Sequence, residues 1–380
     1  MKREQKNAVR RFGKWFLYSA VAMLFVLLTI FSRPSAQGAR ISLERCGATL
    51  IPSLFPFLVL CGFAVRCGFA ERCGRILAPV TRVLFNLPGC TAAVILTALV
   101  GGYPVGARGI RQLLDRGAIT KEEAARMTCF CVGAGPGFVV AAVGEGIFRS
   151  TALGLILLSA QVLAALLLGI ATGFLSRRKG MVSCKKKIQT EPEPAGQALV
   201  ASVADGAQAM LSLCAFVVLF GALLGLCNQL QLPALLAQLL QRIGVPLPAG
   251  LSILPVLLEV CSGTASAACT AETAIFLTAF SLGWGGLCVH FQIFSVLGDL
   301  PFSKRRFFGF RMLHGFIAGG LSALLVPLLP AGNSIVVSGV ITPVQTTHGL
   351  PFTLALLLMI FVFLLSLPFG GGNSQKKMVE

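Results

Sequence analysis

Long, unbroken apolar runs constrain the fold of this 380-residue chain more than any other feature. Each run approaches the roughly 20 residues that a helix needs to cross a bilayer, and none shows the alternation of a membrane β-barrel strand. Since 56% of the residues are hydrophobic and only 12% are charged, an ordinary soluble domain is excluded. We therefore expect an all-α polytopic membrane protein with about eight transmembrane helices. They are expected over Trp15–Phe31, Ala48–Val65, Met127–Phe148, Ala152–Leu175, Ala207–Cys227, Phe276–Leu297, Met312–Leu329 and Phe352–Phe369.

The positive charges predict which loops face the cytoplasm. The formal net charge is +18, and basic residues concentrate in the cytoplasmic loops of membrane proteins. This explanation needs no nucleic-acid partner. The segments expected inside are Lys2–Lys14, Arg66–Arg82, Arg108–Arg126, Arg177–Lys187, Lys304–Arg311 and Lys376–Lys377. Two further stretches, Gly68–Asn86 and Leu232–Ile243, are amphipathic, and the first is expected to lie in the membrane interface.

The N-terminal apolar run has two interpretations. It follows a basic head, and the small residues of "SAQGA" after it resemble a signal-peptide cleavage site. The run is long for a signal peptide, so we expect an uncleaved first span.

The stretch "VGGYPVGARG" (100–109) predicts a broken helix inside the membrane. Thr91–Ala107 lies between two loops that should both be inside, and it is long enough for one crossing at most. A re-entrant segment satisfies both conditions, because non-helical backbone is tolerated at membrane depth where protein or a water-filled cavity surrounds it. The same argument predicts a second re-entrant segment at Ala249–Ser262, entering from the outside.

Weakly similar motifs recur in the same order in the two halves of the chain. "GATLIPSLFPFLVLCGF" (47–63) aligns with "GAQAMLSLCAFVVLFGA" (206–222), and "EAARMTCFCVGAGPGFV" (123–139) resembles "ETAIFLTAFSLGWGGLCV" (272–289). Similar halves of opposite topology are typical of inverted-repeat transporters. The expected domains are an N-terminal span (1–40), a first repeat (41–150), a linking span with a basic loop (151–200), a second repeat (201–330) and a C-terminal span and tail (331–380).

Four interruptions, "GGYPVG", "GAGPG", "CSGTASA" and "GWGG", are the candidate binding elements. The N-terminus of a half-helix presents free N–H groups and a positive dipole end to an anion. The candidate substrate-binding residues are Gly101, Gly102, Tyr103, Pro104, Gly106, Arg108, Gly133, Gly135, Pro136, Ser262, Gly263, Thr264, Ser266, Gly283, Gly285, His290 and Gln292. The alternative for the glycines is close helix packing. For the hydroxyl groups it is bonding within their own helix, and for Arg108 it is a positive-inside marker.

Glu259 is the candidate for proton coupling, because ionisable residues in apolar surroundings are functional candidates by default. It is the only acid between Asp205 and Glu272. A structural pair with an arginine is the alternative.

The chain shows no motif for catalysis or for a cofactor. A P-loop, HExxH, GxSxG and a dinucleotide fingerprint are all missing from the sequence. Most of the 13 cysteines lie inside apolar runs, where they are expected to act as small apolar residues. Three scattered histidines do not predict a metal site. We therefore expect no enzyme activity, no cofactor and no metal.

Six motifs give the chain a resemblance to a known family. "PSLFPFLVLCGF", "LFNLPG", "GGYPVGA", "EAARMTCFCVGAGPGFV", "GGLCVHFQ" and "RMLHGFIAG" resemble the YlbJ family of sporulation integral membrane proteins, in the nucleoside-recognition (Gate) group. The resemblance extends from about Ile41 to Ala323. It implies re-entrant hairpins like those of concentrative nucleoside transporters. It also implies a role in spore maturation, in which a member is linked to moving dipicolinic acid across the outer forespore membrane.

The expected function is a secondary transporter that moves a small anionic metabolite, first of all dipicolinic acid, by alternating access. The alternatives are a transporter or sensor of nucleosides or other small metabolites, and a non-transporting membrane scaffold in spore assembly. The expected partners are the anionic substrate and the lipid bilayer, and a homo-oligomer stays open. The expected location is the bacterial cell membrane, specifically the mother-cell-derived outer forespore membrane, with both termini cytoplasmic.

Overall fold

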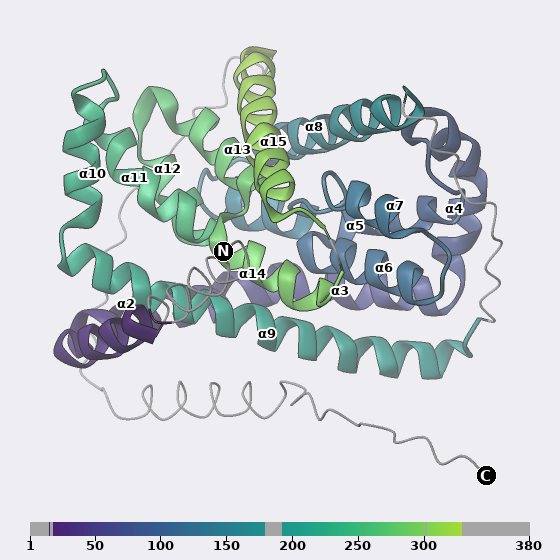
Figure 1. Cartoon of the computed structure of the whole chain (residues 1–380), viewed down its shortest axis with the longest axis horizontal. Helices are drawn as coiled ribbons and strands as arrows, with labels where there is room; N and C mark the ends of the chain where they lie inside the picture. Colours follow the sequence, from purple (N-terminus) through teal and green to yellow (C-terminus); the bar gives the residue numbers. More distant parts are fainter. Residues whose placement is uncertain (1–14, 16–17, 179–191, 301, 329–380) are drawn as a thin grey trace, which may run out of the picture. The chain divides into compact units, whose positions relative to one another are not determined.

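The computed structural model describes residues 15, 18–178, 192–300 and 302–328, and every regular element within these ranges is a helix (Figure 1). The expected all-α class is therefore confirmed. Within the same ranges, five helical stretches are long and apolar enough to cross a membrane: Ser32–Arg66, Thr151–Arg178, Ala195–Gln229, Ala271–Leu297 and Lys304–Leu325. The expected span over Phe352–Phe369, the basic segments Lys2–Lys14 and Lys376–Lys377, and most of the basic linker lie outside the described residues.

The first half begins with an apolar helix, Tyr18–Ile30, and a long helix made of three parts. These parts are α2 (Ser32–Arg45), a π-helical segment (Cys46–Leu50) and α3 (Ile51–Arg66). Pro52 in the first turn of α3 has no N–H to donate. The wider π-helical turn directly before it accommodates that missing hydrogen bond, so the helix continues over 35 residues.

Shorter elements complete the first half. The amphipathic α4 (Phe69–Val80) runs into a π-helical segment (Thr81–Phe85), as expected for Gly68–Asn86. Next come α5 (Thr91–Gly101), α6 (Tyr103–Asp115), α7 (Lys121–Met127), a π-helical segment (Gly137–Glu145) and α8 (Thr151–Arg178). Thr120 and Glu123 fix the start of α7 with a capping box, in which each side chain bonds the other residue's N–H.

The second half has a similar order of elements. A long helix, α9 (Ala195–Gln229), is followed by the short α10 (Leu232–Gln241). Then come α11 (Leu247–Leu258), α12 (Val260–Ala268), a 3₁₀ turn (Ala271–Thr273), α13 (Ala274–Trp284), α14 (Gly286–Leu297), α15 (Lys304–Leu325) and a last 3₁₀ turn (Val326–Leu328).

The two long helices pack against each other in antiparallel orientation (Figure 1). Gly38 of α2 lies against Gly221 and Gly225 of α9, whereas Gly62 of α3 lies against Ser202 near the start of α9. A Cβ added at Gly38 would lie 2.2 Å from the carbonyl oxygen of Gly221. Small residues therefore allow these backbones to approach closely, as is typical of helix pairs in membranes.

One sequence prediction about helix boundaries is wrong. The predicted basic loop Lys304–Arg311 is the beginning of α15, which starts at Lys304 after the N-cap Ser303. The apolar runs Met127–Phe148 and Phe276–Leu297 are each interrupted at a motif that the sequence predicted to be broken, the first at residues 132–135 and the second at Gly285. In the second case the positive φ of Gly285 ends the helix, which hydropathy alone does not register.

A polar contact joins α6 to the turn between α14 and α15. Arg111 donates to the carbonyl oxygen of Leu297 at 3.0 Å and to the carboxylate of Asp299 at 2.7 Å. The Arg111 guanidinium holds the pKa of Asp299 below its usual value. A carboxyl whose pKa is depressed by folding stabilises the fold while it is ionised, and this contribution is lost as the pH falls through that pKa.

We therefore predict a pH-dependent contribution from this contact. Acidification from about pH 5 to about pH 3 spans the ordinary titration of aspartate, and it should lower the melting temperature of wild-type protein more than that of Asp299→Asn. At neutral pH the difference should be small, because the pair is exposed. Thermal unfolding of detergent-solubilised protein across this range measures it, and parallel pH curves for the two proteins would refute the prediction.

Candidate functional site

Two helix interruptions lie in the first half. α5 ends at Gly101 and α6 begins at Tyr103, so Gly102 stands between them with a φ of +79°. This left-handed backbone favours glycine. The second interruption is the non-helical segment 132–135 in "GAGPG", between α7 and the π-helical segment that starts at Gly137. Both interruptions lie in motifs that the sequence predicted to be broken.

Two more interruptions lie in the second half. Gly285 and Gly286 have positive φ angles of +85° and +76° between α13 and α14, in the predicted motif "GWGG". The prediction of a break within "CSGTASA" is wrong, because Val260–Ala268 is the helix α12. The break is at Glu259, which is extended (φ −149°, ψ 125°) and caps the helix.

These interruptions converge in space. A Cβ added at Gly135 would lie 2.9 Å from the backbone nitrogen of Gly102, and one at Gly286 would lie 2.9 Å from that of Glu259. The hydroxyl of Tyr103, directly after the first break, donates to the carbonyl oxygen of Leu282. The breaks of the first half are thus in contact with those of the second.

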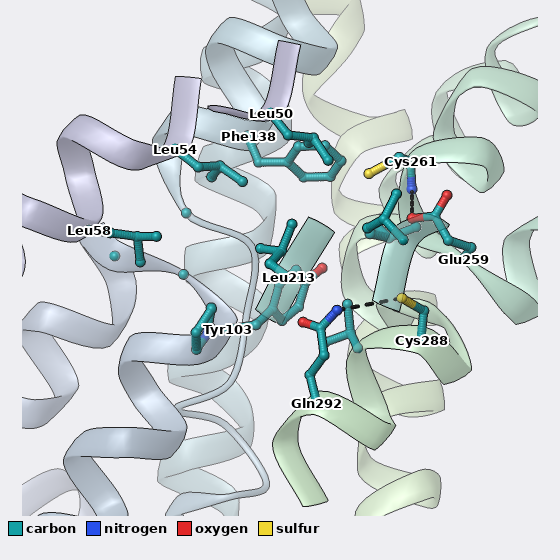
Figure 2. A pocket seen from close by; sticks show the side chains of 17 residues that line it. Leu50, Leu54, Leu58, Tyr103, Phe138, Leu213, Glu259, Cys261, Cys288 and Gln292 are labelled. Carbon is teal, nitrogen blue, oxygen red and sulfur yellow. Dashed lines mark hydrogen bonds between the residues drawn. The ribbon is translucent and has the colours of Figure 1, made fainter. Parts of the chain in front are cut away.

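A cavity lies where the breaks meet, and its empty volume is about 510 Å³ including the open mouth (Figure 2). In Figure 2, Leu54 and Leu58 lie on one side, and Glu259, Cys261 and Cys288 lie on the other. The cavity is lined by Leu50, Leu54, Leu58, Gly101, Gly102, Tyr103, Pro104, Gly135, Phe138, Leu213, Val217, Glu259, Val260, Cys261, Cys288, Val289 and Gln292. A largely apolar wall with a few polar groups is typical of a small-molecule site.

Glu259 is fully buried, and its carboxylate occupies the N-terminus of α12. One carboxylate oxygen accepts from the N–H of Cys261 at 2.8 Å, and the other accepts from the N–H of Ser262 at 2.7 Å. Arg45 reaches the same helix and donates to the hydroxyl of Ser262 at 2.8 Å. No side chain caps the corresponding N-terminus of α6 at Gly102. Among the described residues, the partners of Glu259 are therefore backbone N–H groups rather than the arginine that was the alternative.

Arg311 of α15 lies outside the cavity lining but binds two of the interrupted segments, and the sequence did not reveal it. Its side chain is 0% exposed, and its guanidinium donates to the carbonyl oxygens of Val132 and Gly283. It also lies 3.3 Å from Nδ1 of His314. The sequence analysis placed Arg311 in a cytoplasmic loop. The only signal against that interpretation was its position five residues after Arg306, apart from the pair Arg305 and Arg306.

The predicted site residues divide into two groups. Those that line the cavity are Gly101, Gly102, Tyr103, Pro104, Gly135, Glu259 and Gln292. Those outside its lining are Gly106, Arg108, Gly133, Pro136, Ser262, Gly263, Thr264, Ser266, Gly283, Gly285 and His290.

Several residues of the second group have structural contacts. Gly106 packs against the carbonyl oxygen of Cys131, and Gly283 packs against Gly315. Thr264 donates to the carbonyl oxygen of Val260 in its own helix at 2.8 Å. His290 bonds the carbonyl oxygen of Trp284 at 2.8 Å. Arg108 makes a long, exposed bond of 3.5 Å to the carbonyl oxygen of Asp205.

The sequence analysis missed the apolar wall of the cavity. Leu50, Leu54 and Leu58 recur every four residues, so they share one face of the long first helix. This spacing is visible in the sequence, but every apolar face in a membrane protein looks alike until its neighbour is known. The described cysteines are free thiols, and no group of three or more metal-ligating side chains occurs in this part of the chain.

Together these features define a polytopic α-helical membrane protein with discontinuous helices around an internal cavity. Residues 48–172 match the family model described as Gate, nucleoside recognition. The chain is also similar to the sporulation integral membrane protein YlbJ of Bacillus subtilis (strain 168), with 26% identity over 341 residues that cover 81% of this chain and 82% of the relative. No solved structure matches the chain. The family resemblance drawn from the sequence motifs is thus confirmed.

Proposed function

We propose that the protein is a secondary transporter that binds a small anionic metabolite in the cavity between its interrupted helices and moves it by alternating access. The observation that carries this proposal is that three of the four helix interruptions, at Gly102, Gly135 and Glu259, line one cavity. Tyr103 and Gln292 add polar groups to the same lining. Interrupted helices with substrate sites between them are the usual design of such transporters.

We further propose that residues 41–150 and 201–330 form an inverted repeat. Each half starts with a helical stretch of 35 residues, Ser32–Arg66 or Ala195–Gln229, and these run antiparallel. Each continues with a short helix, a helix pair with a break between its members, and a second break. This order supports the expected count of about eight spans, in which short helices complete the crossings. The basic residues of Lys2–Lys14 and Lys376–Lys377 are the ground for proposing cytoplasmic termini.

As substrate we propose dipicolinic acid, a small aromatic dianion. No side chain caps the N-terminus of α6 at Gly102, so its positive dipole end suits a carboxylate, although Pro104 in its first turn has no N–H to donate. The leucine side of the cavity suits an aromatic ring. The similar Bacillus subtilis protein is a sporulation membrane protein, which supports a location in the outer forespore membrane. Because residues 48–172 match a nucleoside-recognition family, nucleosides are the second candidate substrates.

Uptake of labelled dipicolinate into proteoliposomes tests the function. We expect saturable uptake that unlabelled dipicolinate inhibits and nucleosides do not. If nucleosides inhibit the uptake and unlabelled dipicolinate does not, nucleosides replace dipicolinic acid as the proposed substrates. If correctly inserted protein takes up neither dipicolinate nor nucleosides above the level of empty vesicles, the alternative of a non-transporting membrane scaffold is favoured.

A variant of the cavity lining tests where the substrate binds. Gln292→Leu removes a polar side chain from the lining, and it should raise the KM for dipicolinate about tenfold, the equivalent of one hydrogen bond of about 1.4 kcal/mol. Gln241→Leu makes the same change at an exposed position at the end of α10, and it should leave the KM unchanged. Equal KM values for both variants and wild type would place the binding site elsewhere.

A further inference from the structure

We propose that Arg311 is a positioning residue that ties the interrupted segments of the two halves together and thereby controls how readily the cavity opens. One part of this proposal, that opening of the cavity is a step of transport, rests on the proposed function. Its structural part concerns α15 and two carbonyl groups that belong to different halves of the chain.

The contacts of Arg311 join segments that are far apart in the sequence. Val132 begins the non-helical segment after α7, and Gly283 lies in the last turn of α13, two residues before the break at Gly285. One guanidinium binds the carbonyl oxygens of both. A planar guanidinium presents its donors in a fixed fork, so it can hold two acceptors at once in a defined geometry.

The charge of Arg311 fits this role. No carboxylate lies within 4.0 Å of its nitrogens in the described ranges, so its charge is not balanced by an ion pair there. A buried charge without a partner is costly in a membrane. The free carbonyl groups at a helix C-terminus carry partial negative charge, and Gly283 supplies such a group. The carbonyl ends of the interrupted segments therefore compensate the buried charge, and they would lose this compensation if they moved apart.

Tyr103 connects Arg311 to the cavity. Its ring lines the cavity, its hydroxyl donates to the carbonyl oxygen of Leu282, and the Arg311 guanidinium lies 6.0 Å from the ring centroid. Tyr103 thus binds the carbonyl of Leu282, and Arg311 binds the neighbouring carbonyl of Gly283. A displacement of the end of α13 must break both contacts, and it would move a wall residue of the cavity at the same time.

Site-resolved labelling of native cysteines with N-ethylmaleimide tests the proposal without a substrate. Cys261 lines the cavity and is 8% exposed, so its labelling rate reports opening. Cys269, at the end of α12, is exposed and serves as the internal standard. Cys46, in the π-helical segment of the long first helix, is buried and reports global unfolding. Mass spectrometry of the full-length protein in proteoliposomes gives the three rates separately.

We compare Arg311→Lys, which keeps the charge but loses the fork, with Arg311→Gln, which loses both. Each should raise the labelling rate of Cys261 relative to Cys269 at least tenfold, equivalent to about 1.4 kcal/mol in the opening equilibrium. Cys46 should stay protected. Arg305→Gln is the matched control, because it removes an exposed arginine from the same helix and should change no rate.

A second variant covers the case in which neither Arg311 variant folds. Tyr103→Phe removes only the hydroxyl that binds Leu282, and it should raise Cys261 labelling by a smaller factor of about three to ten. Rates within twofold of wild type in all folded variants would overturn the proposal, and so would labelling of Cys46 in parallel with Cys261. Either result leaves the transport experiment intact, and a failure of dipicolinate uptake would not change the labelling rates.

Discussion

Replacing Glu259 with glutamine is expected to reduce uptake at least about 100-fold, to background, while the protein remains inserted and abundant. The carboxylate accepts one N–H with each oxygen, from Cys261 and from Ser262. A glutamine amide has a single oxygen, so one of the two N–H groups would face an NH₂ donor instead. Hydrogen bonds to a charged group contribute about 1.5–3 kcal/mol each, and losing part of two of them is enough for this effect.

Two further substitutions separate the charge of Glu259 from its capping role. Aspartate and serine are both good N-cap residues, but only aspartate keeps the negative charge. If the charge takes part in transport, Glu259→Asp retains most of the uptake and Glu259→Ser loses it, although both proteins are stable. Uptake rates and melting temperatures, measured on the same preparations, provide the comparison. Full uptake by Glu259→Ser would show that the residue only caps α12 and would remove it from proton coupling.

The sequence predicted the positions of the breaks better than their contacts. Gly102 and Gly285 have positive φ angles, which glycine adopts more readily than other residues, so the motifs "GGYPVG" and "GWGG" indicate them directly. "CSGTASA" misled because its glycine suggested that the helix is interrupted within the motif. In the structure Thr264 bonds a carbonyl of its own helix, α12. Glu259 caps α12, so the break lies at Glu259, before the motif.

Arg311 shows what the sequence could not reveal. A basic residue at the end of a cluster that includes Arg305 and Arg306 resembles every other positive-inside marker. Its burial depends on which helices surround α15, and that is decided by the glycine contacts of α13 with α15, where Gly283 packs against Gly315. The partners of Arg311 are carbonyl groups, which all residues possess, so no side-chain pattern points to them. The apolar walls of the cavity could not be predicted for the same reason, because an apolar helix face does not show which element packs against it.

Replacing Gly106 with alanine is expected to be the most destabilising small substitution in α6. A Cβ at this position would lie 1.8 Å from the carbonyl oxygen of Cys131, a distance that only a backbone shift can relieve. Overpacking of this kind costs about 1–3 kcal/mol and occasionally more. We expect a loss of at least about 3 kcal/mol, because the clash is with backbone atoms rather than with the end of a flexible side chain.

Gly320→Ala in α15 is the matched control, because nothing lies within 4 Å of a Cβ added at Gly320. Alanine is a better helix former than glycine by up to about 1 kcal/mol, so this variant should be as stable as wild type or slightly more stable. Unfolding of both variants in detergent gives the comparison, and equal stability would contradict the close contact at Gly106. Since Cys131 directly precedes the carbonyl of Val132 that Arg311 holds, a shift at Gly106 should also loosen that contact. The surviving folded fraction of Gly106→Ala should therefore label faster at Cys261, while Gly320→Ala should label like wild type.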